Sequence, residues 1–272
     1  EAKAVANPSH RDDTVGHVRE ATVEDVDRAL AAAERGAPAW AAVPPEERAS
    51  VLDATADRLE AGHARLMALI VREAGKTAAN AAAEVREAAD FLRYYAAEVR
   101  GTFDNATHRP LGPVACISPW NFPLAIFVGQ VSAALAAGNA VLAKPAEQTP
   151  LVAAEAVRAL WAAGVPRDAI QLLPGEGATV GAALVGDPRV KGVLFTGSTE
   201  VARLLQRSLV GRVDGRGRAI PLIAETGGQN AMIVDSSALP EQVVADVLAS
   251  AFDSAGQRCS ALRVLCLQEE AA

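Results

Sequence analysis

Histidine is scarce in this sequence, and its positions are uninformative for catalysis. The four histidines all precede the region where strand-like and helical segments alternate: His10, His17, His63 and His108. A Ser-His-Asp or Cys-His arrangement therefore has no obvious base in that region. No group of histidines and cysteines has the spacing of metal ligands, so we expect no metal site.

Cysteine is also sparse, which argues against a disulfide framework. The three cysteines, Cys116, Cys259 and Cys266, are odd in number and include no Cys-x-x-Cys pair. This usage fits a reducing compartment, and we expect a cytoplasmic protein.

Positive charge and long hydrophobic runs are missing as well. The formal net charge is −7 and the isoelectric point is about 5.2, so nothing indicates a nucleic-acid partner or an anionic membrane surface. The most apolar stretch, residues 122–138, is interrupted by Pro123, Gly129, Gln130 and Ser132. It falls short of a membrane span and predicts a buried helix instead.

Alanine supplies much of the apolar content. Half of the residues are hydrophobic, but only 4% are aromatic, a composition that favours packed helices over disorder. The 272 residues are enough for one large domain or two smaller ones. The chain opens on glutamate and stops just after a strand-like run, so we expect a piece of a longer protein.

Residues 1–110 are predicted to be mostly helical. Apolar residues recur at steps of three and four from Leu52 to Ile70, and this stripe ends near Gly75. A second stripe runs from Val85 to a stop at Gly101.

Beyond residue 111, short apolar runs alternate with helical segments. The strand-like runs lie at 114–118, 140–143, 170–173, 190–195 and 222–224. Apolar strands separated by helices predict an α/β fold, with a Rossmann-like parallel sheet covered by helices on both faces. Two more runs, at 231–234 and 263–267, flank a helix over 242–255. Its inward residues are predicted to be Val243, Val247, Leu248 and Phe252.

The ends of the predicted strands carry the candidate functional residues, because ligands of an open parallel sheet bind at the carboxyl ends of its strands. The first end is Pro119-Trp120-Asn121-Phe122-Pro123. Its Asn121 amide is suited to holding an oxyanion and equally to capping the next helix.

The second strand end is Lys144-Pro145-Ala146-Glu147. The chain has only four lysines against 22 arginines, so a lysine here is not compositional noise. Lys144 and Glu147 have the spacing to grip a ribose, although the residues alone favour a solvated ion pair at a helix start.

The third strand end is the turn Phe195-Thr196-Gly197-Ser198-Thr199-Glu200. Free N–H groups and the helix dipole would make it a pyrophosphate site, although many strand-to-helix turns contain Gly-Ser. Nearby, residues 175–181 imitate the dinucleotide fingerprint, but the last glycine comes one residue late.

The fourth strand end supplies reactive groups. Glu225 follows the run at 222–224, and Cys259 lies in Gly256-Gln257-Arg258-Cys259-Ser260. A thiolate is a strong nucleophile, and a nearby carboxylate can activate water. A single cysteine is more often inert than catalytic, and Cys116 and Cys266 lie inside apolar runs.

Together, these blocks resemble the aldehyde dehydrogenase superfamily. Its signatures appear here as Pro-Trp-Asn-Phe-Pro, Lys-Pro-Ala-Glu, Phe-Thr-Gly-Ser-Thr-Glu, Glu-x-Gly-Gly and Gly-Gln-x-Cys. The amino-acid sequences of residues 72–77, 108–113, 224–228 and 254–263 resemble one branch of this superfamily. That branch is the L-glutamate γ-semialdehyde (1-pyrroline-5-carboxylate) dehydrogenase module of bifunctional proline-utilization A proteins.

The resemblance implies a role for each block. Cys259 would attack a small-molecule aldehyde to form a thiohemiacetal, with Asn121 and the Cys259 N–H holding the oxyanion. Glu225 would activate the water that hydrolyses the later thioester. The cofactor would be NAD, and FAD would be present only if a proline dehydrogenase module precedes this chain. The implied NAD-binding residues are Ile117, Trp120, Lys144, Glu147, Gly177, Gly181, Phe195, Gly197, Ser198 and Thr226.

The resemblance also implies an organisation. Residues 1–222 would form the NAD-binding domain, divided into a helical region (1–110) and the Rossmann-like sheet (111–222). Residues 223–272 would begin a catalytic domain that is truncated here. The full-length protein would be a homo-oligomer that acts in proline catabolism. The alternatives are a dehydrogenase for another aldehyde, such as succinate semialdehyde, and an inactive NAD-binding fragment.

Overall fold

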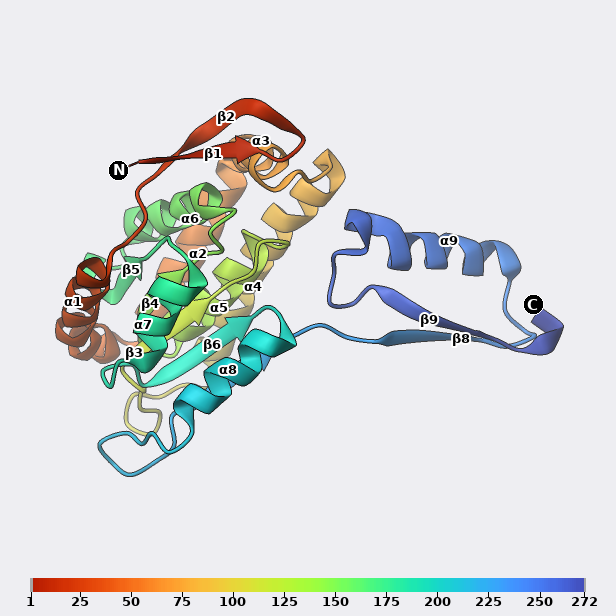
Figure 1. Ribbon diagram of the computed structural model, residues 1–272. Coiled ribbons are helices and arrows are strands. Elements are labelled where there is room, and N and C mark those ends of the chain that lie inside the picture. The colour runs from red at the N-terminus through yellow and green to blue at the C-terminus, as the bar shows by residue number, and fades with distance from the viewer. Residues whose placement is uncertain (1, 272) are drawn as a thin grey trace.

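A five-stranded parallel sheet organises the computed structural model, which describes residues 2–271 (Figure 1). The strand order is β5-β4-β3-β6-β7, and every neighbouring pair is parallel. The strands are β3 (Pro113–Ile117), β4 (Ala140–Lys144), β5 (Ile170–Leu172), β6 (Gly192–Thr196) and β7 (Leu222–Glu225). The predicted α/β class is confirmed, and β7 carries the sheet past residue 222.

Helices cover both faces of this sheet because its side chains are apolar in both directions. Val114 and Cys116 of β3 join the core beneath α5 and α6, whereas Ala115 and Ile117 join the core beneath α7 and α8. These helices are α5 (Ala125–Ala136), α6 (Pro150–Ala163), α7 (Ala182–Gly186) and α8 (Thr199–Leu209). Short helical turns lie at Arg167–Ala169 and Gly177–Gly181.

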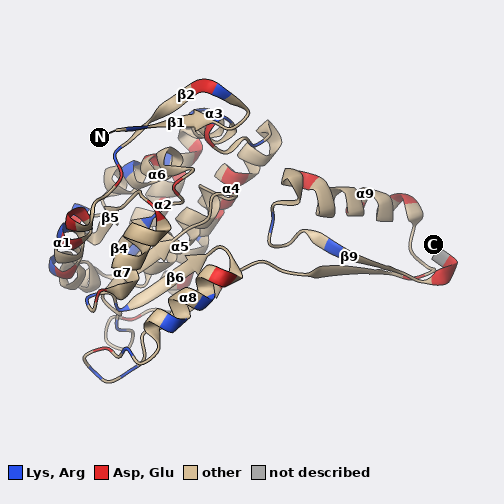
Figure 2. Cartoon of the chain, in the orientation of Figure 1, with Lys and Arg blue, Asp and Glu red and all other residues tan. Residues whose placement is uncertain are grey.

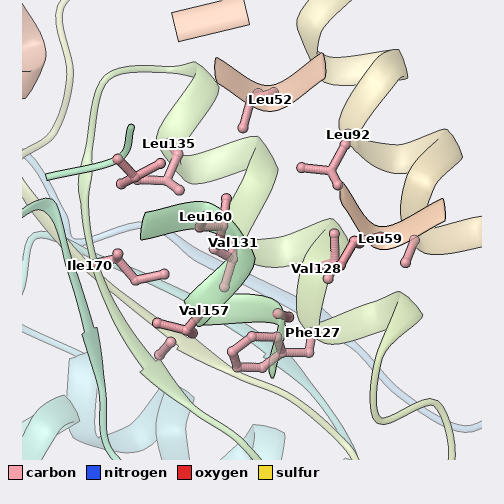
Figure 3. Close-up of a cluster of buried hydrophobic side chains, with 14 of the residues drawn as sticks. Leu52, Leu59, Leu92, Phe127, Val128, Val131, Leu135, Val157, Leu160 and Ile170 are labelled. Atoms are coloured by element: carbon pink, nitrogen blue, oxygen red, sulfur yellow. The ribbon is translucent and has the colours of Figure 1, made fainter. Parts of the chain in front are cut away.

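The N-terminal helices complete both layers and form no separate body. They are α1 (Val23–Ala42), α2 (Pro45–Ala61), α3 (His63–Ala74) and α4 (Ala78–Thr102). Helix α1 packs on the face of α7 and α8, and the other three pack behind α5 and α6. Figure 3 shows Leu52, Leu59 and Leu92 from this layer in one cluster with Phe127 and Val131 of α5.

Two features of the N-terminal region differ from the prediction. The chain begins with a hairpin of β1 (Lys3–Asn7) and β2 (His10–Val18) rather than a helix. Only Val5 is buried in it, so the strands carry little of the hydrophobic alternation that would reveal them. The apolar stripe from Leu52 to Ile70 belongs to two helices, because the helix is interrupted at Gly62.

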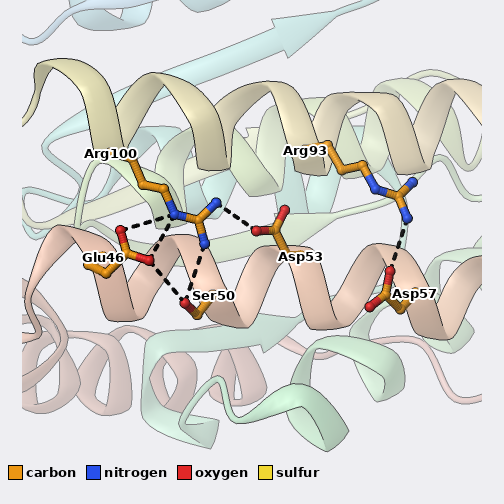
Figure 4. Close-up of polar contacts among 6 residues, drawn as sticks. All are labelled: Glu46, Ser50, Asp53, Asp57, Arg93 and Arg100. Carbon is orange, nitrogen blue, oxygen red and sulfur yellow. Dashed lines mark hydrogen bonds and ion pairs between the residues drawn. The ribbon is translucent and has the colours of Figure 1, made fainter.

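Ion pairs line the solvent side of the contact between α2 and α4 (Figure 4). Arg100 Nη1 lies 2.7 Å from Asp53 Oδ2, and Arg93 Nη2 lies 3.0 Å from Asp57 Oδ1. Exposed pairs contribute about 0–1 kcal/mol each, so the apolar stripe contributes most of the stability here.

Helix α5 is almost entirely buried, and its C-terminal carbonyls are bonded by residues of other helices. The buried Arg48 donates from Nε to Ala136 O (2.8 Å), and Trp40 donates from Nε1 to Leu135 O (3.0 Å). Within residues 2–271, neither α5 nor another helix is both long and apolar enough to cross a membrane.

The N-terminus of α6 is capped by a buried carboxyl group from α3. Glu73 accepts hydrogen bonds from the N–H groups of Leu151 (2.6 Å) and Val152 (2.9 Å). The pKa of Glu73 is raised to about 7 because burial penalises its anion more than these two bonds stabilise it.

This buried carboxyl predicts a pH-dependent stability. The native state keeps a proton that the unfolded chain releases above a pKa of 4.5, so stability falls as pH rises towards about 7. We expect that Glu73 removes about 3 kcal/mol of unfolding free energy across this window. Denaturant unfolding at pH 4.5 and 7.5 should show a correspondingly smaller loss for Glu73→Gln than for the wild type. Parallel pH profiles would contradict the prediction.

Residues 230–271 form a small unit beside the main body (Figure 1). Strands β8 (Asn230–Val234) and β9 (Leu262–Leu267) pair in parallel, and α9 (Pro240–Phe252) connects them. The expectation for α9 is wrong in part. Leu248 and Phe252 are exposed, and Val243 and Val247 are only half-buried. The two-stranded sheet covers only one side of α9, and α9 covers only one face of the sheet. Apolar residues of both elements therefore stay on the surface.

The β8–β9 pair also exposes apolar side chains to solvent. Ile233 is 82% exposed, and β8 carries no charged side chain (Figure 2). Such a strand is unusual for a solvent-facing surface, where charged residues normally protect an edge.

Candidate active site

A cavity of about 790 Å³ opens at the carboxyl ends of the sheet strands, between the main body and the loop before β9. Its wall includes these predicted site residues: Ile117, Trp120, Asn121, Lys144, Glu147, Gly177, Phe195, Gly197, Ser198, Thr226 and Cys259. The other two predicted residues, Gly181 and Glu225, are not part of this wall. Segments more than a hundred residues apart in the sequence therefore meet at one place.

Asn121 connects the sheet to the loop that carries Cys259. Its Nδ2 donates a hydrogen bond of 2.7 Å to Gln257 O, two residues before the exposed Cys259. The helix that follows Asn121 has Leu124 at its N-cap and no side-chain cap. Asn121 is therefore not a helix cap in this structure, and its amide faces the cysteine loop.

Further hydrogen bonds hold the backbone of the cysteine loop. Asn230 Nδ2 donates to Cys259 O (2.7 Å) and to Ala261 O (3.0 Å). Arg263 Nη2 donates to Gly256 O at 2.7 Å. The positive φ angles of Ser254 (54°) and Ala255 (53°) are unusual for residues other than glycine, so tertiary contacts must maintain this turn.

Lys144 and Glu147 form the predicted pair at the end of β4. Lys144 Nζ lies 3.4 Å from Glu147 Oε2 and donates to Pro145 O at 3.0 Å. Burial lowers the pKa of the Lys144 ammonium, and the Glu147 carboxylate partly opposes that shift. Because Lys144 is buried and Glu147 is partly exposed, the pair offers an oriented carboxylate to the cavity.

Two glycines near this pair differ in their surroundings. A Cβ atom on Gly177 would meet nothing within 4 Å, so the backbone borders open space in the cavity. A Cβ on Gly181 would lie 3.8 Å from Lys144 Cδ, so Gly181 packs along the lysine stem outside the cavity wall. A cofactor role for Gly181 stays a prediction.

The turn after β6 presents a helix N-terminus to the cavity. Ser198 is the N-cap of α8, and its Oγ accepts a hydrogen bond of 3.2 Å from Val201 N. The other free N–H groups of this helix start and the helix dipole favour an anionic group nearby.

Glu225 lies in a smaller adjoining hollow of about 240 Å³. The two hollows share Phe195 and Thr196 of β6 in their walls. Gln130 Nε2 donates to Thr196 Oγ1 at 3.0 Å, on the Glu225 side. Among the described residues, the exposed Glu225 carboxylate has no hydrogen bond or ion pair that fixes its direction.

Sequence reasoning missed the part of the cavity wall that α4 and the turn before it contribute. Lys76, Glu84 and Glu87 line the cavity opposite the sheet. Lys76 Nζ lies 2.7 Å from Glu84 Oε1, and burial, followed by the charge of Glu84, raises the pKa of Glu87. The scarcity of lysine that drew attention to Lys144 applies equally to Lys76 and was the available signal.

Comparisons with known proteins agree with this architecture. The chain is 68% identical over its whole length to the bifunctional protein PutA of Klebsiella aerogenes, of which it spans 21%. It is 38% identical, over 94% of its length, to the 1-pyrroline-5-carboxylate dehydrogenase 1 of Halalkalibacterium halodurans, of which it spans 52%.

A solved structure of a 1-pyrroline-5-carboxylate dehydrogenase has the same fold. The fold superimposes with a TM-score of 0.94 on the Thermus 1-pyrroline-5-carboxylate dehydrogenase with bound NAD. This match covers the whole chain and 55% of that protein, at 35% identity. The sequence pattern of the aldehyde dehydrogenase family matches residues 1–272, and the chain belongs to this family.

Proposed function

We propose that the protein oxidises L-glutamate γ-semialdehyde to L-glutamate with NAD as the oxidant. The observation that carries the proposal is the cavity, where Cys259 and Asn121 meet the Lys144–Glu147 pair. The similarity to PutA proteins and to 1-pyrroline-5-carboxylate dehydrogenases supports this substrate. The chain spans only about a fifth of those PutA relatives, so activity and substrate are proposed for the full-length protein.

The residues present fit NAD. The cavity volume of about 790 Å³ lies within the range of small-molecule sites. Glu147 would accept hydrogen bonds from ribose hydroxyls and repel a 2′-phosphate, which favours NAD over NADP. Ser198 and the N–H groups at the start of α8 would hold the pyrophosphate. Trp120 and Ile117 would border the nicotinamide.

In the first half-reaction, the Cys259 thiolate would attack the aldehyde carbon and form a C–S bond. The carbonyl oxygen then becomes an oxyanion, which the Cys259 N–H and Asn121 would stabilise. One N–H of the Asn121 amide bonds Gln257 O, and the second has no partner among residues 2–271, so it would be free for the oxyanion. NAD, when bound, supplies the hydride acceptor that converts this adduct to a thioester.

In the second half-reaction, Glu225 would take a proton from water as the water attacks the thioester carbon. The C–S bond would then break, releasing the carboxylic acid product and the Cys259 thiolate. Its adjoining hollow shares a wall with the main cavity. The carboxylate has no fixed partner among the described residues, so it can turn from the smaller hollow into the main cavity.

We also propose that the NAD-binding domain comprises residues 1–222 and that the catalytic domain begins at residue 223. The full-length protein is proposed to be a homo-oligomer.

The substrate proposal is tested by comparing kcat/KM of the full-length protein for three aldehydes. We expect glutamate semialdehyde to exceed butanal by at least about 100-fold, because a site built for an amino-acid head leaves polar groups unpaired around a plain aldehyde. Succinate semialdehyde should fall between them. Equal or better use of butanal would overturn the substrate and leave the dehydrogenase activity standing.

A further inference from the structure

The helix that follows Asn121 lacks the usual means of satisfying its N-terminus. Helix α5 has no acidic residue in its first turn and no side-chain cap. The first N–H groups of a helix need partners, and buried ones are costly to leave unpaired. Residues of other helices bond the C-terminal carbonyls of α5, so its N-terminus is the end that still needs partners.

Glu84 of α4 supplies the missing partner. Its Oε2 accepts hydrogen bonds from Leu124 N (3.2 Å) and Ala125 N (2.9 Å), and its side chain is 1% exposed. A carboxylate at this position also complements the positive end of the helix dipole. Such charge-assisted bonds are directional, so they fix where α5 begins.

Lys76 contacts the segment between Asn121 and α5 from a second side. Its Nζ forms the 2.7 Å ion pair with Glu84 Oε1 and lies 4.1 Å from the ring centroid of Phe122, the neighbour of Asn121. The lysine side chain is only 6% exposed. Lys76 and Glu84 therefore contact the chain immediately after Asn121, at residues 122, 124 and 125.

We propose that Glu84, paired with Lys76, is a positioning residue that fixes the Asn121 amide at the place where the oxyanion forms. This inference rests on the proposed function, because it assigns Glu84 an effect on oxyanion stabilisation through Asn121. Misplacement of a reacting group by about 1 Å can cost roughly 100-fold in rate, so a loosened start of α5 has a kinetic consequence.

The test is a double-mutant cycle on the full-length protein, read as the rate of the NADH burst at saturating NAD. We expect Glu84→Gln alone, with Asn121 present, to slow the burst by about 10–100-fold. In an Asn121→Ala background, the same substitution should cost less than about twofold, because the residue it positions is gone. KM for NAD should change little in either background.

Glu73→Gln is the matched control, since Glu73 is also a buried carboxyl that caps a helix from outside, at α6. It should alter stability and leave the burst rate within about twofold of the wild type. If Glu84→Gln does not fold, Glu84→Asp keeps the charge but shortens the reach, and it should show the same non-additivity.

The outcomes separate this inference from the proposed function. Equal losses from Glu84→Gln in both backgrounds, or an unchanged burst while Asn121→Ala is slow, would overturn the positioning role alone. A normal burst in Asn121→Ala would overturn the oxyanion role of Asn121 and the positioning role together.

Discussion

Cys259→Ala is expected to abolish NADH formation from every aldehyde tested, because the variant has no group to form the thiohemiacetal from which hydride leaves. Loss of a catalytic nucleophile costs on the order of 10⁴-fold or more in kcat, which would place the residual rate below detection. NAD binding should survive, since Cys259 is exposed on a loop and the Lys144–Glu147 pair lies on β4 and the turn after it. The two measurements are NADH absorbance with aldehyde and NAD affinity by calorimetry.

The other two cysteines provide the controls. Cys116 lies inside β3, where burial raises the pKa of its thiol and its Sγ contacts Gln130 O at 3.7 Å. Cys266 is exposed on β9, outside the cavity wall. Cys116→Ala and Cys266→Ala should both keep aldehyde oxidation. If either folded variant lost it while Cys259→Ala retained it, the nucleophile would be misassigned.

The strand ends were predictable from the sequence because they depend on a general property of parallel sheets. Asn121, Lys144 and Ser198 each follow an apolar run, and parallel strands align their carboxyl ends at one edge. Once the strands are recognised, the gathering of these residues follows. The resemblance then supplied roles that spacing left open, such as the choice between oxyanion donor and helix cap for Asn121.

The supporting contacts were not predictable in this way. Lys76 and Glu84 lie in a segment with an ordinary helical pattern, and their partners at Phe122 and Leu124 are about forty residues away. No local periodicity specifies which carboxylate will reach the N-terminus of which helix. Only the packing of α4 on α5 shows that Glu84 replaces the cap that α5 lacks.

The errors have a related physical cause. The apolar residues Leu248 and Phe252 of α9 show helical spacing, which predicts a buried face. Periodicity indicates that a helix has an apolar stripe and does not show whether another element covers it. The N-terminal hairpin gives the opposite error, because its strands are exposed on both sides and so lack a stripe.

Glu225→Gln is expected to separate the two half-reactions. A glutamine cannot accept the proton of the attacking water, so hydrolysis of the thioester should slow by about 10²–10⁴-fold. In the proposed mechanism Cys259 and Asn121 form the thioester without Glu225, so this step should proceed at close to the wild-type rate. The full-length variant should therefore release about one NADH per active site in a rapid burst and then turn over slowly.

The position of Glu225 makes this experiment informative. Its carboxylate lies in the hollow beside Gln130 and Thr196, apart from the Cys259 cavity, and has no hydrogen-bonding partner among the described residues. A carboxylate that turns into the main cavity only for hydrolysis would leave the burst intact. If Glu225 instead activates the Cys259 thiol, the burst itself will disappear, and the carboxylate belongs to the first half-reaction. Rapid mixing with absorbance at the NADH band distinguishes the two results within a single turnover.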